Sequence, residues 1–179
     1  LPGTYQLRIS YMGDTVLTSL EVKPDPRSPY DLAGMKEKQV IADQLLGKME
    51  ELNESLNRIR DCREGFDLVR KLTDKEQSES LEHLTEVMEE QLILLEKDMF
   101  RDENIQGIYY PSDALFTQFS GTYEILGSAT PLTENQLDKF SGLMSLADDA
   151  LASINAFMEG EWAVYREAVL KEEISLLKD

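Results

Sequence analysis

The stretch TYQLRISYMGDTVLTSLEV, residues 4–22, decides how the rest of the chain is interpreted. Apolar and polar side chains alternate in residues 5–11 and again in residues 16–22, with Gly13-Asp14 between the two runs. A period of two on both sides of a Gly-Asp turn predicts a β-hairpin. No other stretch of the sequence has a strand pattern.

An isolated two-stranded hairpin is marginally stable in water. The chain also opens directly at the first strand, without Met or a leader. We therefore expect residues 1–27 to be the last hairpin of an immunoglobulin-like β-sandwich that belongs to a longer protein, and residues 28–179 to be a helical domain that continues from it. The free edge of the hairpin should be covered by helix ends or paired with a second copy.

The rest of the chain carries four helical patterns, in which apolar residues recur every three or four positions. The expected helices are residues 30–72, 73–99, 112–126 and 133–177. Their expected N-caps are Ser28, Thr73, Ser112 and Thr133. The strongest of these signals is the capping box of Thr133 and Gln136, beside which Leu132 can pack on Leu137.

These patterns predict a mainly α fold: an antiparallel bundle of about four helices, two long and two shorter, preceded by an N-terminal β-hairpin. Short connections favour antiparallel neighbours, so the last helix should run unbroken back to the start of the first. We expect Trp162, Tyr165 and Val169 to pack there against residues 30–35, near the hairpin. The apolar run in residues 92–95 should be packed on more than one side.

Composition excludes several classes of function. The 179 residues carry a formal charge of −17, with 18 basic and 35 acidic residues, so no basic surface is available for nucleic acid. No apolar run approaches the roughly 20 residues that span a bilayer, so we expect no membrane insertion. The single cysteine, Cys62, adjoins the apolar stripe of its helix and is interpreted as structural.

No catalytic or metal-binding pattern is found in the sequence. A di-metal bundle needs two Glu-x-x-His pairs, but His83 is the single histidine and Ser80 precedes it by three positions. With one histidine on a polar helix face, no nucleophile–base arrangement is indicated. Paired-carboxylate catalysis needs a cleft that raises the pKa of one carboxyl group, whereas the acidic residues of this sequence fall at expected exposed helix positions. We therefore predict no enzyme activity, no cofactor and no metal.

Aromatic residues are the remaining signal. Phe116, Phe119 and Tyr123 have helical spacing and are interpreted as core. Tyr109 and Tyr110 lie in an expected loop, and they are the best candidates for an exposed contact with a partner.

Several short motifs carry a resemblance to a known family. They are LPGTY (residues 1–5), LEV (20–22), DPR (25–27) and LNESLNRIRDCR (52–63). The chain resembles the C-terminal region of bacterial sortilin-like BNR-repeat proteins, which are β-propeller proteins often described as glycosyl hydrolases. In that family a strand module and a helical tail follow the propeller. The resemblance implies an exported protein whose catalytic residues would lie in a propeller outside these 179 residues.

Two functions follow as hypotheses. The first is a non-catalytic accessory module that supports the rest of a larger polypeptide, with a homodimer as a further possibility. The alternative is a binding module that holds a glycan or a protein partner through the loop aromatics Tyr109 and Tyr110 or through the acidic helix faces.

Overall fold

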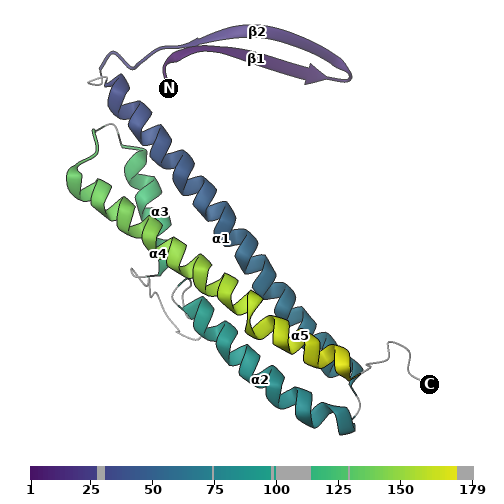
Figure 1. Cartoon of the computed structure of the whole chain (residues 1–179). Coiled ribbons are helices and arrows are strands. Elements are labelled where there is room, and N and C mark those ends of the chain that lie inside the picture. Colours follow the sequence, from purple (N-terminus) through teal and green to yellow (C-terminus); the bar gives the residue numbers. More distant parts are fainter. Residues whose placement is uncertain (28–30, 74, 98, 100–113, 129, 173–179) are drawn as a thin grey trace, which may run out of the picture.

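The computed structural model describes residues 1–27, 31–73, 75–97, 99, 114–128 and 130–172. Within these residues it is a helical bundle preceded by an antiparallel hairpin, which confirms the predicted fold class (Figure 1). The elements are β1 (Gly3–Tyr11), β2 (Asp14–Val22), α1 (Leu32–Leu72), α2 (Lys75–Lys97), α3 (Leu115–Leu126), α4 (Glu134–Glu159) and α5 (Glu161–Lys171).

The helix starts only partly follow the expected caps. Thr133 and Gln136 form the predicted capping box, in which each side chain accepts a hydrogen bond from the other's backbone N–H. The N-cap of α1 is Asp31, whose carboxylate accepts from the Ala33 N–H, so the prediction of Ser28 is wrong. Ala114 stands at the N-cap of α3 without a side-chain bond, which replaces the predicted Ser112. Ser28 and Ser112 themselves lie outside the described residues. Thr73, the predicted N-cap of α2, stands at the C-cap of α1, where its hydroxyl donates to the Val69 carbonyl (2.9 Å).

The path of the chain differs from the one expected. Helix α2 returns along α1, since Arg70 pairs with Glu82 near the turn between them. Helix α3 then continues in the direction of α2: the Phe116 N–H donates to the Met99 carbonyl, and Ser128 reaches Lys38 near the start of α1. Helix α4 therefore begins at the hairpin end and runs away from it, so α3 and α4 each run opposite to the predicted direction.

Helix α1 consequently lies parallel to α4 and α5. Each contact between them joins residues 96–100 positions apart in the sequence. The contacts are Lys48 with Asp148 (2.8 Å), Arg58 with Asn155 (2.7 Å), Cys62 with Met158 (3.7 Å) and Phe66 with Trp162 (ring centroids 5.6 Å). This constant offset keeps one face of α1 against one face of the last two helices.

The expectation for the C-terminal aromatics is therefore wrong. Trp162 and Tyr165 pack edge-to-face on Phe66, near the end of α1, and not beside the hairpin. The predicted unbroken last helix is also interrupted, because α4 ends at Glu159 and α5 starts after Gly160. Gly65 allows this packing, since a Cβ on it would lie 3.3 Å from the Trp162 ring.

The core follows the predicted stripes closely. Leu45, Leu52, Ile59 and Phe66 of α1 are almost fully buried. In α4, Ala147 and Ile154 are buried as their spacing predicts, and the buried Leu143 and Phe157 lie next to that stripe. The run at residues 92–95 is an exception, because Ile93 and Leu94 are exposed on the outer side of α2. The apolar run therefore does not widen the packed surface of α2 as predicted, although α2 contacts α1, α4 and α5.

Candidate functional site

The hairpin is the first unusual feature. Its register runs without a break from Gly3 opposite Val22 to Tyr11 opposite Asp14. The turn residues are Met12 and Gly13, both with positive φ, one position earlier than the predicted Gly13-Asp14. Two such residues match the type I′ turn, whose twist suits a right-handed pair of strands.

One face of this hairpin is apolar. Residues directly opposite in the register share a face, so Tyr5 lies beside Leu20 and Ile9 beside Val16. The other face carries polar and charged side chains such as Gln6, Arg8 and Ser10. Every residue of both strands is exposed, and Ile9 and Val16 expose 54% and 62% of their surface. We call the side chains of Tyr5, Leu7, Ile9, Val16, Leu20 and Val22 the apolar hairpin face.

The edges of the hairpin are equally open. In residues 3–22 there is no proline and no interruption of the register, and the charged side chains are Arg8, Asp14 and Glu21. Proteins usually protect free strand edges with charges, prolines or bulges. Among the described residues the sheet has these two strands alone, and the hairpin extends sideways from the end of the bundle (Figure 1). The prediction that helix ends of this chain cover the hairpin edge is wrong.

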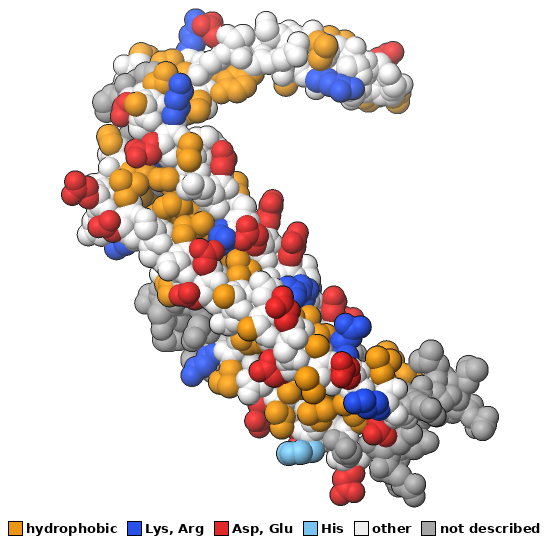
Figure 2. All heavy atoms as spheres, in the orientation of Figure 1, with side chains coloured by type: hydrophobic (Ala, Val, Ile, Leu, Met, Phe, Trp, Pro, Cys, Tyr) orange, Lys and Arg blue, Asp and Glu red, His pale blue; other side chains and the backbone are white. Residues whose placement is uncertain are grey.

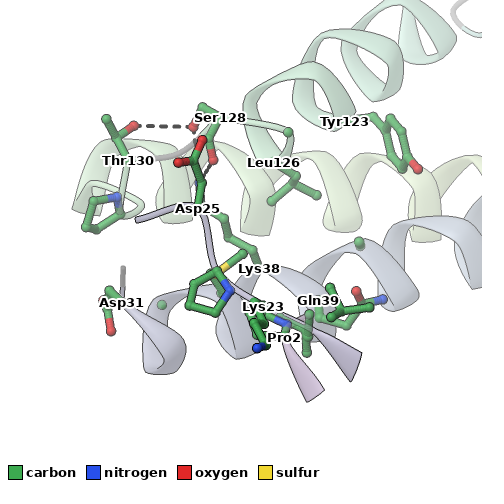
Figure 3. A pocket seen from close by; sticks show the side chains of 18 residues that line it. Pro2, Lys23, Asp25, Asp31, Lys38, Gln39, Tyr123, Leu126, Ser128 and Thr130 are labelled. Atoms are coloured by element: carbon green, nitrogen blue, oxygen red, sulfur yellow. Dashed lines mark hydrogen bonds between the residues drawn. The ribbon is translucent and has the colours of Figure 1, made fainter. Parts of the chain in front are cut away.

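A cavity of about 530 Å³ lies where the hairpin meets the bundle (Figure 3). Its walls come from the hairpin exit, from the first turns of α1 and from the end of α3 with the loop that follows. Apolar wall residues include Val22, Pro24, Met35, Ala42 and Leu126. Tyr123, which the sequence pattern placed in the core, is exposed and lines this cavity.

Lys38 is the buried charge of the cavity. It is 8% exposed, and its Nζ donates to the carbonyl oxygen of Ser128 (2.7 Å) and to the Ser128 Oγ (3.1 Å). Sequence reasoning missed this residue. A signal was present, because Lys38 precedes Ile41 by three positions and Leu45 by seven, and so lies on the apolar stripe of α1.

The other end of the bundle holds an ion-pair network. Arg70 contacts Glu82 (3.1 Å) and makes two hydrogen bonds to Glu89 (2.7 and 2.9 Å). Hydrogen bonding to Arg70 lowers the pKa of Glu89 and, in turn, raises the pKa of the guanidinium. The side chains of Arg70 and Glu89 are about one-third exposed, so solvent weakens the interaction between their charges. The network joins α1 to α2, and we call it the clasp.

The surroundings of Cys62 and His83 do not indicate a catalytic role. Cys62 is buried in the core, as predicted, and burial raises the pKa of its thiol to about 11. A thiol with such a pKa is almost fully protonated near neutral pH and is a poor nucleophile. His83 is exposed on α2, also as predicted (Figure 2).

The described residues hold no group of three or more His, Cys, Asp or Glu side chains placed to bind a metal ion. In the same residues each buried side-chain nitrogen or oxygen has a hydrogen-bond partner. Acidic and basic side chains are interspersed along the face of the bundle that Figure 2 shows. No described helix combines the length and apolarity that crossing a membrane requires.

Tyr109 and Tyr110, the predicted contact residues, lie outside the described part of the chain. The structure therefore leaves two described features as candidate sites: the apolar hairpin face with its open edges, and the cavity around Lys38. Comparisons with protein-family models, with curated proteins and with solved structures found no match to this chain.

Proposed function

We propose that this chain is a non-catalytic accessory module of a larger, exported BNR-repeat protein, and that its hairpin completes a β-sandwich elsewhere in the same polypeptide. The observation that carries the proposal is the apolar hairpin face, which is exposed along its whole length at the end of a bundle with its own core. A surface of this kind marks a contact that is missing from the isolated chain.

The open edges favour a sheet as the occupant. Strand addition to a sheet satisfies the unpaired backbone N–H and C=O groups of an edge, whereas helix packing on the face alone does not. Two aligned sheets also bury alternate residues of each strand, which is the pattern of Tyr5, Leu7 and Ile9. The bundle then acts as a rigid spacer that begins at the sandwich.

This proposal is tested by measuring amide hydrogen exchange in residues 3–22, both in the chain alone and in the longer polypeptide that contains it. We expect fast exchange in the chain alone and at least 100-fold slower exchange in the longer polypeptide. Ile9→Glu, on the apolar hairpin face, should remove that protection. Ser10→Glu, one residue away on the polar face, is the matched control and should retain it.

Two results would overturn the proposal. One is fast exchange of the hairpin amides in both polypeptides. The other combines fast exchange of the hairpin amides in the longer polypeptide with a dimer of the chain alone, detected by light scattering. Ile9→Glu would dissociate that dimer, and Ser10→Glu would leave it intact. A second copy of the chain would then be the occupant of the apolar hairpin face.

A further inference from the structure

The cavity at the junction of hairpin and bundle contains a buried cation, Lys38, that is paired with no carboxylate of the described residues. The described ion pairs of the chain do not include Lys38, and the two acceptors of its ammonium both belong to the neutral Ser128. Burying a charge is unfavourable unless an opposite charge or sufficient hydrogen bonds compensate it. In a chain with a net charge of −17, acidic partners for this lysine are abundant in the sequence.

The carboxylates that line the same cavity are engaged elsewhere. Asp25 accepts two hydrogen bonds from the Arg27 guanidinium (2.9 and 3.1 Å) and a third from the Arg27 N–H. Asp31 caps α1 through the Ala33 N–H. Lys23, the other lysine of the lining, is exposed and pairs with Glu21. Among the described lining residues, Lys38 is thus the one cationic side chain without an acidic partner.

The cavity also has the dimensions and wall chemistry of a ligand site. Ligand-binding cavities usually measure about 300–1,000 Å³ and combine apolar walls with a few polar groups, and this one measures about 530 Å³. Met35 and Ala42 from α1 line the cavity together with Leu126 from α3. Lys38 reaches across it to Ser128 (Figure 3). An ammonium has three N–H donors, so Lys38 retains one for a ligand.

We propose that this cavity binds a small amphipathic carboxylate, with its apolar body between α1, α3 and the hairpin exit and its carboxylate on the Lys38 ammonium. The anion supplies the charge that Lys38 lacks, and its chain fills the apolar part of the cavity. Val22 is the one residue of the apolar hairpin face that also lines this cavity. The other five residues of that face are not part of the lining, so ligand binding can be tested without docking of the hairpin.

Calorimetric titration of the whole chain with decanoate, below the concentration at which it forms micelles, tests the proposal. We expect one decanoate to bind per chain. Lys38→Met retains the length and apolar stem of the side chain and should weaken binding at least tenfold. Lys36→Met, an exposed position on the same helix outside the lining, is the control and should leave the affinity unchanged.

A second variant tests the apolar half of the site. Ala42→Trp places a large side chain in the cavity while leaving Lys38 in place, and it should abolish binding. Circular dichroism of each variant verifies that the bundle is folded. Absence of decanoate binding to the folded wild-type chain would overturn the proposal, and so would equal affinity of the wild type and Lys38→Met.

Discussion

Thr85 of α2 and Tyr165 of α5 share a hydrogen bond of 2.9 Å inside the bundle, 80 positions apart in the sequence. The Thr85 hydroxyl also donates its single proton to the Leu81 carbonyl, so Tyr165 must be the donor to Thr85. Burial raises the pKa of the Tyr165 phenol, which keeps this donor protonated. The two hydroxyls thereby connect the C-terminal helix to α2.

Because Tyr165 donates and Thr85 accepts, removing the donor and removing the acceptor should lower the free energy of unfolding by different amounts. Tyr165→Phe leaves Thr85 bonded to Leu81 and should lower the free energy of unfolding by about 1 kcal/mol. Thr85→Val leaves the Tyr165 hydroxyl buried without its acceptor and should cost more, about 1–3 kcal/mol. Urea denaturation of both variants and of the double variant measures the difference. Equal losses that add in the double variant would contradict the assigned donor.

Phe66 should be a principal source of stability at the end of the bundle distant from the hairpin. It is fully buried and contacts both Trp162 and Tyr165 edge-to-face. Phe66→Ala should lower the free energy of unfolding by about 3–5 kcal/mol, because it leaves a cavity between α1 and the Trp162 and Tyr165 rings of α5. Val164→Ala, at an exposed position of α5, should stay within about 0.5 kcal/mol of the wild type. Denaturation midpoints compare the two variants.

The clasp between Arg70 and Glu89 predicts a pH dependence. Arg70 lowers the pKa of Glu89 in the folded state, so the clasp contributes its full stabilisation above the unfolded pKa, near 4.5. That contribution is lost as the pH falls through the lower, folded pKa. Thermal unfolding between pH 6 and pH 3 should therefore show a steeper loss for the wild type than for Glu89→Gln. Parallel curves for the two proteins would rule out the clasp as a source of acid sensitivity.

Two glycines of α1 should respond differently to alanine. A Cβ at Gly47 meets no atom within 4 Å, so Gly47→Ala should stabilise the helix by about 0.5–1 kcal/mol. A Cβ at Gly65 would lie 3.3 Å from the Trp162 ring, so Gly65→Ala should gain less than Gly47→Ala or lose stability. Thermal unfolding of both variants gives the comparison. A larger gain at Gly65 would contradict the close approach of Trp162.

The turn of the hairpin can be improved. Met12 adopts a positive φ of 47°, a conformation that Asn tolerates better than a long side chain. Met12→Asn creates an Asn-Gly turn and should slow amide exchange in residues 3–22 several-fold. Met12→Val, which disfavours positive φ more strongly, should accelerate it. Exchange that is the same in all three proteins would show that the turn does not limit hairpin opening.

Local signals in the sequence were sufficient for the two strands, the helical stretches and the start of α4, but not for the starts of α1 and α3 or for the break between α4 and α5. The alternation of residues 5–11 and 16–22 predicts the two strands, and the Thr133–Gln136 capping box marks the start of α4 to the residue. The apolar stripes predict which side chains are buried, because a helix at 3.6 residues per turn presents them on one face. These features depend on interactions between residues a few positions apart, and such interactions can be inferred directly from the sequence.

The path of the helices and both candidate sites depended on contacts between distant residues. A stripe shows that α4 has an apolar face but not which end of α1 that face meets. The pairing of Phe66 with Trp162 is decided when α3 continues the direction of α2. Likewise, the position of Lys38 on the apolar stripe of α1 does not identify its hydrogen-bond partner, because Ser128 is 90 positions away in the sequence. The sequence alone determined the strands, the helical stretches and most of their buried faces. Tertiary packing decided the direction of the helices, the exposed hairpin and the cavity around Lys38.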